Sequence, residues 1–173
     1  MHLAVRQVAR WLCASVVGCV VVAGLTACSP PAPVHIGFIG GLTDRNADNG
    51  QAGLNGVILA VEQFNREGGV QGRMVELVVH DDAQNRDTAA QATQALVDAQ
   101  VEAVIGPFTS GMAEVIVPIT GKAGIFQVSP TITSMAFYGK DDNLFRINRT
   151  TRDNAQEYAK VMTGLGQRNI AVA

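Results

Sequence analysis

The sequence predicts an α/β fold, a doubly wound parallel sheet with helices on both faces. Two observations support this prediction. From residue 34 onward, short apolar segments typical of strands alternate with longer segments whose apolar residues recur at helical spacing. Polar or glycine-containing loops separate these segments. Strands that alternate with helices form a parallel sheet through right-handed crossovers.

Two strand–helix units make up the first half of this pattern. Residues 34–39 (VHIGFI) are an expected buried strand, and a loop follows at 40–49. The helix expected at 51–67 ends at Gly68-Gly69, a glycine cap. Its apolar positions are Leu54, Val57, Ile58, Val61 and Phe64. A second strand is expected at 74–79 and a polar turn at 81–85. An alanine-rich helix is expected at 86–98, and the residues on one side of it are Ala92, Ala95, Leu96 and Ala99.

The second half repeats the alternation with shorter strands. The expected strands are 103–105, 125–128 and 144–147, with a hydroxyl-rich loop at 129–134. A helix is expected at 111–123 although Pro118 lies inside it, and another at 151–165 begins at a Thr-Thr cap region. Residues 169–173 begin a further strand. We therefore expect the chain to be the front part of a larger protein.

The first 28 residues have the pattern of a bacterial lipoprotein signal. Arg6 and Arg10 precede an uncharged apolar run from 11 to 24, and small residues follow it. Leu-Thr-Ala-Cys at 25–28 resembles a lipobox, which makes Cys28 the lipidated first residue of the mature chain. The alternative is a transmembrane anchor, but the stretch from residue 11 to residue 28 is slightly short of the roughly 20 apolar residues that a span requires. The expected organisation is a signal peptide at 1–27, a lipidated Cys and Pro-rich tether at 28–33, a lobe at 34–168 and the start of a second lobe at 169–173.

Charge and cysteine usage exclude several classes of function. The chain has 13 basic and 15 acidic residues; with Arg6 and Arg10 in the leader, the mature part has 11 basic residues and a net charge of −4. This acidity argues against a nucleic-acid partner, which requires a basic face. Cys13 and Cys19 leave with the leader, so Cys28 remains alone and no intramolecular disulfide is possible.

The expected ligand site lies beyond the carboxyl ends of the strands, where open parallel sheets bind ligands. Thr109 and Ser110 stand between a strand and a helix N-terminus, whose N–H groups and partial positive charge suit a carboxylate or phosphate. Thr131 and Thr133 supply further hydroxyls at the next strand end. From residue type alone, ordinary caps and turns are the more frequent use of such Ser and Thr residues.

Other chemistries lack their motifs. Gly37, Gly40 and Gly41 do not have the spacing of a dinucleotide-binding loop. No second His or Cys cluster completes a metal site around His80-Asp81-Asp82, and capping of the following helix is the better explanation of Asp82. No Gly-x-Ser-x-Gly nucleophile motif occurs either. We expect no metal, no cofactor and no enzymatic activity.

Several motifs together resemble one known family. They are VHIGFIGGLT at 34–43, GQAGLNGVILAVEQFNREGGVQGR at 50–73, VVHDDAQN at 78–85, VEAVIGPFTS at 101–110 and GIFQVSPTIT at 124–133. In order and spacing they resemble the branched-chain amino-acid (leucine/isoleucine/valine) periplasmic binding proteins of the type I fold. The resemblance covers nearly all of residues 34–173 and implies a two-lobed protein that traps its ligand in the cleft, of which this chain holds most of the first lobe.

The resemblance also implies site residues. The first-lobe positions that hold the ligand's carboxylate and ammonium groups fall on Ser110, Thr131 and Thr133. Asn49 stands where the amino-acid binders often place an aromatic residue near the cleft. Gln84 and Thr109 occupy the region of a disulfide found in some members.

The leading hypothesis is a solute-binding lipoprotein of an ABC importer. It would be anchored to a bacterial membrane in the periplasm or at the cell surface, bind an amino acid or a related small polar molecule, and deliver it to a membrane permease. The alternative is a sensory or envelope-assembly lipoprotein with the same fold.

Overall fold

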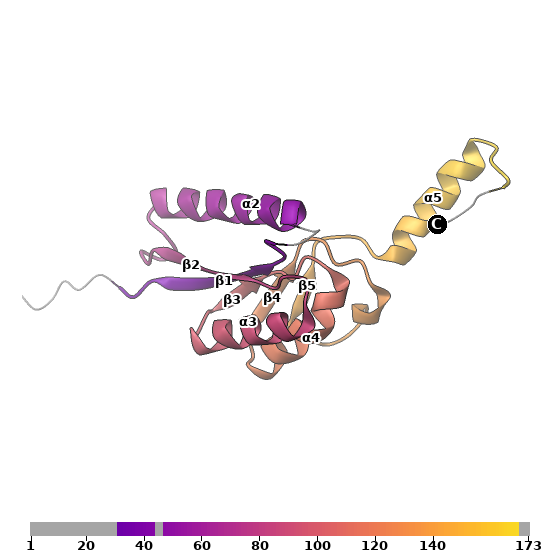
Figure 1. Ribbon diagram of the computed structural model, residues 1–173. Helices are drawn as coiled ribbons and strands as arrows, with labels where there is room; N and C mark the ends of the chain where they lie inside the picture. The colour runs from indigo at the N-terminus through magenta and orange to yellow at the C-terminus, as the bar shows by residue number, and fades with distance from the viewer. Residues whose placement is uncertain (1–30, 44–46, 170–173) are drawn as a thin grey trace, which may run out of the picture. The chain divides into compact units, whose positions relative to one another are not determined.

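Five parallel strands form one sheet in the order β2-β1-β3-β4-β5 (Figure 1). The computed structural model describes residues 31–43 and 47–169. The strands are β1 (Val34–Gly40), β2 (Val75–Asp81), β3 (Ala103–Ile105), β4 (Phe126–Ser129) and β5 (Leu144–Arg146). Gly37 is paired with Val78 on one side and Val104 on the other, so the strand order reverses around β1. The predicted doubly wound parallel sheet is confirmed.

Helices cover both faces of this sheet. They are α2 (Ala47–Arg66), α3 (Arg86–Asp98) and α4 (Ser110–Lys122). A short 3₁₀ helix η2 (Met135–Phe137) precedes β5, and α5 (Thr151–Gly164), none of whose residues is buried, follows it. Figure 1 shows α2 on one face of the sheet and α3 and α4 on the other. Pro118 lies inside α4 without ending it. All the predicted helices are present, whereas η2 was not predicted.

The boundaries of two elements, α2 and β2, differ from the predictions by more than one residue. α2 already includes Ala47, four residues before the expected start, with Asp48 in its first turn where a carboxylate favours a helix N-terminus. The predicted loop at 40–49 is therefore too long, and Asn49 is helical. β2 extends to Asp81, because its ladder with β1 continues to the pair Gly40–Asp81.

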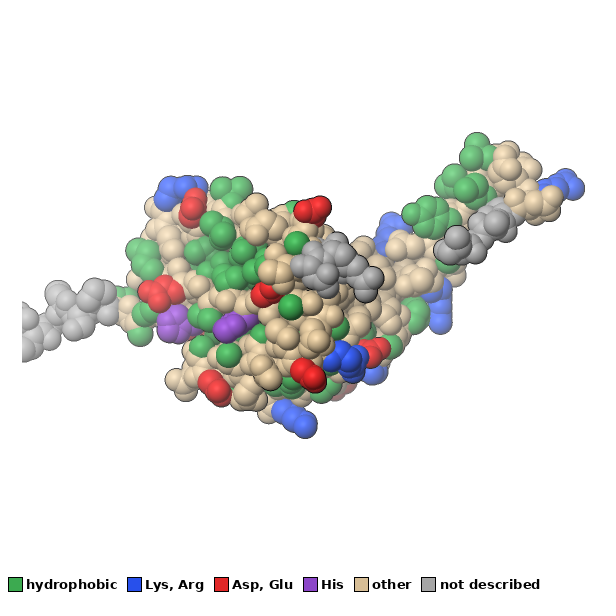
Figure 2. Space-filling view, viewed as in Figure 1, with side chains coloured by type: hydrophobic (Ala, Val, Ile, Leu, Met, Phe, Trp, Pro, Cys, Tyr) green, Lys and Arg blue, Asp and Glu red, His purple; other side chains and the backbone are tan. Residues whose placement is uncertain are grey.

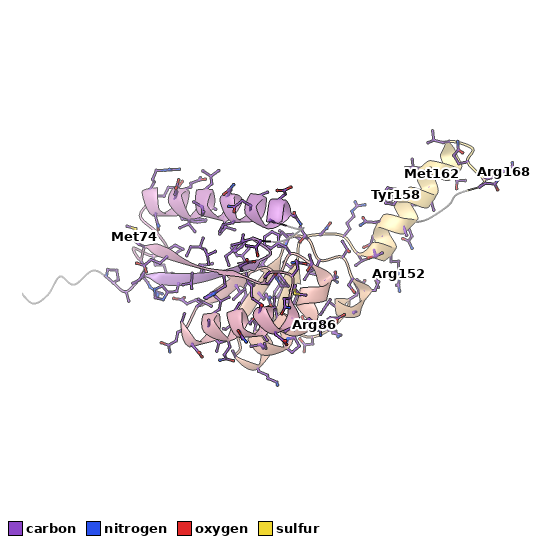
Figure 3. All side chains as sticks on the ribbon, in the orientation of Figure 1. Met74, Arg86, Arg152, Tyr158, Met162 and Arg168 are labelled. Atoms are coloured by element: carbon purple, nitrogen blue, oxygen red, sulfur yellow. The ribbon has the colours of Figure 1, made fainter. Side chains whose placement is uncertain are left out.

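The main core lies between the sheet and the α3–α4 layer. Ile39 and Val104 from the sheet pack there with Leu96 of α3 and Ile116 of α4, and all four are fully buried. The buried residues of α3 are Ala89, Ala92, Thr93 and Leu96, at helical spacing. Arg86 at the start of α3 pairs with Glu114 of α4 at 3.0 Å, which joins the two helices at the surface (Figure 3).

A smaller cluster lies beneath α2. Phe38 and Phe108 have ring centroids 5.3 Å apart and pack with Leu54, the one large residue of α2 that is buried. Gly53 allows α2 to approach Phe108, since a Cβ at this position would lie 2.2 Å from the ring. Phe64, which was predicted on the apolar face of α2, is 54% exposed.

Helix ends follow the predicted cap chemistry with one correction. Gly68 and Gly69 have positive φ after α2, and Thr150 forms a capping box with Asp153 at the start of α5. The cap of α3 is Asn85, whose side chain accepts hydrogen bonds from the N–H groups of Asp87 and Thr88. The prediction that Asp82 caps α3 is wrong, because its carboxylate is held by Gln84 instead.

Some predictions lie outside the described residues. These are the signal peptide at 1–27, the lipidated Cys28 with the first two residues of the tether, and the strand at 169–173 apart from its first residue. Within the described ranges, no helix combines the length and the apolar character that a membrane span requires.

Candidate ligand-binding site

The predicted hydroxyl residues lie on two adjacent loops at the carboxyl edge of the sheet. Thr109 and Ser110 follow β3, Thr131 and Thr133 follow β4, and these two strands are paired from Ala103–Phe126 to Ile105–Val128. All four residues are partly buried. The topology thus brings together residues that are more than 20 positions apart in the sequence.

The N-terminus of α4 has no side-chain cap. Its N-cap residue, Thr109, has the extended backbone of a cap (φ −131°, ψ 146°), yet its side chain makes no bond to the helix. The Thr109 hydroxyl donates instead to Gln84 Oε1 at 3.1 Å. By contrast α3, η2 and α5 are capped by Asn85, Ser134 and Thr150. Among the helices whose caps are described, α4 alone leaves its first-turn N–H groups to another acceptor.

Hydrogen bonds fix the loop that leads into α4. Gln127 Nε2 donates to the Gly106 carbonyl at 2.9 Å, Ser129 Oγ to that of Pro107 at 2.7 Å, and Thr131 Oγ1 to that of Phe108 at 2.6 Å. The Gly106–Pro107 peptide bond is cis. The loops after β3 and β4 therefore form one connected platform, in which the Thr131 hydroxyl keeps acceptor capacity.

Thr133 connects this platform to the start of α5. Its carbonyl accepts from the N–H of Thr151 at 2.8 Å and from the Thr151 hydroxyl at 3.1 Å. The backbone of Thr133 thus takes part in the link between the sheet and α5.

Asn49 lies apart from the loops, on the first turns of α2, and is exposed. It lines an apolar trough of about 680 Å³ between α2 and the sheet, together with Thr131. Apolar side chains of four strands form the floor, among them Ile36, Ile105 and Val128. Figure 2 shows hydrophobic side chains gathered along α2. Asn49 therefore contributes a polar group to a mainly apolar wall.

Asp81 fastens the loop after β1 to the turn after β2, a role that the sequence did not reveal. Its carboxylate accepts hydrogen bonds from the Leu42 N–H at 2.8 Å, the Ala83 N–H at 2.8 Å and the Thr43 hydroxyl at 2.6 Å. Burial acts to raise the pKa of Asp81, but these hydrogen bonds outweigh it and hold the pKa below its ordinary value. Asp81 is thus an ionised structural link.

Asp82 has the opposite character, although it is the next residue. It is fully buried, and Oδ1 accepts from the Gln84 N–H at 2.8 Å and from Gln84 Nε2 at 2.9 Å. Its other oxygen, Oδ2, has no hydrogen-bond partner in the part of the chain that is described. Burial, and secondarily the charge of Asp81, raise the pKa of Asp82. Over the same residues, no three His, Cys, Asp or Glu side chains converge as a metal site would require.

Comparison with known proteins now decides the family. A model of the periplasmic binding protein family matches residues 33–173. This match spans more than half of the chain and includes every described strand and helix. The chain belongs to the periplasmic binding protein family. Membership implies a place outside the cytoplasm.

Similar proteins are named for branched-chain amino acids. The Leu/Ile/Val-binding protein BraC3 of Rhizobium johnstonii is 34% identical over 103 residues, 60% of this chain and 28% of that protein. The Leu/Ile/Val-binding protein homolog 3 of Brucella melitensis is 29% identical over 82% of this chain and 39% of its own length.

Solved structures give the same result. The branched-chain amino acid transporter substrate-binding protein LivJ of Streptococcus pneumoniae, in complex with isoleucine, has a TM-score of 0.66 and 34% identity over 68% of this chain and 34% of that one. An ABC transporter substrate-binding protein of Desulfitobacterium hafniense, in complex with Leu, has a TM-score of 0.68 and 28% identity over 78% of this chain and 39% of its own. The chain thus spans between about a quarter and two fifths of the length of these relatives.

Proposed function

We propose that this chain is the first lobe of an extracytoplasmic solute-binding lipoprotein of an ABC importer, which binds an amino acid or a related small polar ligand between two lobes. Closure of the lobes around a hinge would trap the ligand, and the closed form would deliver it to the membrane permease. The protein acts by binding, without a cofactor or metal.

The uncapped N-terminus of α4 is the observation that carries this proposal. A carboxylate placed there would accept hydrogen bonds from first-turn N–H groups and meet the positive end of the helix. Ser110 stands at the first position of α4, and Thr109, Thr131 and Thr133 lie on the same two loops. The hydroxyls of Ser110 and Thr133 can donate to the carboxylate of an amino acid. The Thr131 hydroxyl, which donates to the Phe108 carbonyl, can accept from the ammonium group, while the Thr109 hydroxyl is engaged by Gln84.

The names of the relatives support the ligand class. BraC3 is named for leucine, isoleucine and valine, and the LivJ structure holds isoleucine. Among the residues that the structure describes, no charged side chain lines the apolar trough, as an aliphatic ligand side chain would prefer. Asn49 and Thr131 are polar residues of its lining, so a ligand with a more polar side chain fits the proposal as well.

Binding of leucine, isoleucine and valine to the full-length protein, measured by calorimetry, tests the proposal. We expect Ser110→Ala to weaken the affinity about tenfold, as expected for a lost hydrogen bond to a charged group. Ser134→Ala is the matched control, because Ser134 caps η2 and is not assigned to the ligand. An unchanged affinity in Ser110→Ala would remove Ser110 from the site, and a failure to bind any amino acid would favour the sensory or envelope-assembly alternative.

The lipid anchor is tested separately. The Leu-Thr-Ala-Cys motif at 25–28 motivates it. Mass spectrometry of the membrane fraction should find a mature N-terminus at Cys28 that carries acyl chains, and Cys28→Ala should abolish this product. An intact Met1 or an unmodified Cys28 would contradict the proposal.

A further inference from the structure

Three loops at the carboxyl edge of the sheet meet at the side chain of Gln84. Gln84 belongs to the turn after β2 and bonds to Asp82 within that turn. Its Oε1 accepts from Thr109, at the end of the loop after β3. The loop after β1 also packs on it, since a Cβ at Gly41 would lie 2.9 Å from Gln84 Nε2.

The orientation of the Gln84 amide is set by its partners. Nε2 can only donate, and it does so to Asp82 Oδ1 at 2.9 Å. Oε1 then faces Thr109 as the acceptor of its hydroxyl. Ala83 and Gln84 both have positive φ (47° and 49°), a conformation that non-glycine residues rarely adopt. The turn thus holds an unfavourable backbone conformation in which Gln84 reaches Thr109.

The bond to Gln84 changes what Thr109 does for α4. The backbone of Thr109 is that of an N-cap, and threonine is a favoured cap residue whose hydroxyl accepts from the second or third N–H of the helix. Those N–H groups belong to Gly111 and Met112. Because the hydroxyl is directed to Gln84, neither group receives a side-chain cap from Thr109.

We propose that Gln84 is a positioning residue for the ligand site, which keeps the α4 N-terminus open by holding the Thr109 hydroxyl away from it. Without Gln84, the hydroxyl turns to cap α4 and competes with the ligand carboxylate for the same N–H groups. This inference rests on the proposed function for the identity of the ligand.

Binding of leucine to the full-length protein tests the competition. Gln84→Met keeps the length of the side chain and removes its hydrogen bonds to Asp82 and Thr109. We expect roughly tenfold weaker binding, because a cap of ordinary strength now has to be displaced. The double variant Gln84→Met/Thr109→Val has no hydroxyl to form the cap and should bind more tightly than Gln84→Met. Merely structural damage by Gln84→Met would not be reversed by a second substitution. Gln94→Met, which removes an exposed hydrogen bond to Asp98 on α3, is the matched control and should bind as the wild type does.

Amide hydrogen exchange in the chain of 173 residues tests the cap without a ligand. In Gln84→Met, the Gly111 and Met112 amides should exchange several-fold more slowly than in the wild type, and the double variant should lose this protection. If the wild type binds none of the three amino acids, the proposed function fails while the exchange rates still report on Gln84.

Should Gln84→Met not fold, Thr109→Asn installs a strong cap beside an intact Gln84 and is expected to weaken binding while protecting the same amides. Equal affinity in Gln84→Met and the wild type, or unprotected amides in the folded variants, would overturn the inference.

Discussion

Two adjacent carboxylates, Asp81 and Asp82, show how strongly position determines the chemistry of a residue here. Asp81 accepts three hydrogen bonds at the surface of the turn and has a lowered pKa. Asp82 is fully buried, is bonded through one oxygen and has a raised pKa. Asp81 is the last residue of β2 and Asp82 the first residue after it. Ionised Asp81 therefore stabilises the two loops that it joins, whereas ionisation of the buried Asp82 destabilises the folded chain.

Asp82→Asn is expected to stabilise the chain at neutral pH. The pKa of Asp82 in the folded state lies above its ordinary value of 3.8. The contribution of the protonated carboxyl group to the free energy of unfolding is therefore complete below pH 3.8 and is lost as the pH rises through the folded-state pKa. Asparagine keeps the oxygen that Gln84 uses and carries no charge. The gain in unfolding free energy over the wild type, from urea denaturation, should therefore be larger at pH 7 than at pH 4. Asp98→Asn, at an exposed position on α3, serves as the control; a gain that does not increase with pH would contradict the cause assigned here.

At the level of elements, α2 depends on small residues where it meets the sheet. Added Cβ atoms would lie 1.9 Å from the Gly41 carbonyl oxygen at Gly50 and 2.2 Å from the Phe108 ring at Gly53, whereas nothing lies within 4 Å at Gly56. Gly53→Ala should therefore destabilise the chain by about 1–3 kcal/mol through overpacking. Gly56→Ala, one turn further along the same helix, should stabilise it by about 1 kcal/mol, because alanine is the better helix former. Thermal unfolding of both variants checks the pair, and equal shifts would refute the close approach.

The start of α5 depends on its capping box. The Thr150 hydroxyl donates to Asp153 Oδ2 at 2.6 Å, and this hydrogen bond is the main cause of the lowered pKa of Asp153. No residue of α5 is buried, and Tyr158 and Met162 project from it in Figure 3, so the cap matters more than packing for this helix. Thr150→Val should raise the pKa of Asp153 and speed amide exchange in the first turn of α5 roughly fivefold, with the sheet core unaffected.

The sign of the pH effect at this cap follows from the direction of the shift. A lowered pKa of Asp153 in the folded state means that its contribution is present above 3.8 and is lost as the pH falls through the folded-state value. The first turn of α5 should therefore fray in acid. Thr163→Val, at the far end of α5, is the control, since its hydroxyl bonds only within the helix to the Ala159 carbonyl. An unchanged titration of Asp153 in Thr150→Val would contradict the assigned cause.

At the scale of the whole molecule, one face of the sheet is incompletely covered in the described part of the chain. Phe126 and Phe145 stack with ring centroids 4.8 Å apart, yet they are 46% and 55% exposed. Parallel sheets are normally buried on both faces. We expect the chain of 173 residues to bind a hydrophobic dye, and Phe126→Ser to reduce the fluorescence clearly. Tyr158→Ser, which removes an exposed aromatic residue from α5 outside the trough, should have little effect; equal losses in the two variants would exclude the trough as the dye site.

A single lobe also limits binding. The chain covers 28–39% of the length of the proteins compared above, and small-molecule sites usually bury most of the ligand surface. We predict that calorimetry with leucine detects no binding to the chain of 173 residues alone, whereas the full-length protein binds. A micromolar dissociation constant for the chain alone would contradict the two-lobed mechanism.

Local sequence patterns determined much of this molecule. Apolar periodicity predicted each described α-helix and each strand of the sheet, but not the 3₁₀ helix η2. Burial of one helix face or of both strand faces produces a regular spacing of apolar residues in the sequence. Cap and glycine chemistry located the ends of α2 and α5, since those interactions join residues only a few positions apart. The family resemblance and the two hydroxyl loops were likewise visible in the sequence.

Only the tertiary structure determined the hydrogen-bond partners of these polar side chains. Thr109 could cap α4 or reach another loop, and Asp82 could cap α3 or turn into the core; residue type permits each choice. The outcome depended on Gln84, which lies 25 positions from Thr109 and meets it because the order β2-β1-β3 brings their loops to one edge. Such contacts depend on how all the strands and helices pack together, so a local sequence pattern does not predict them.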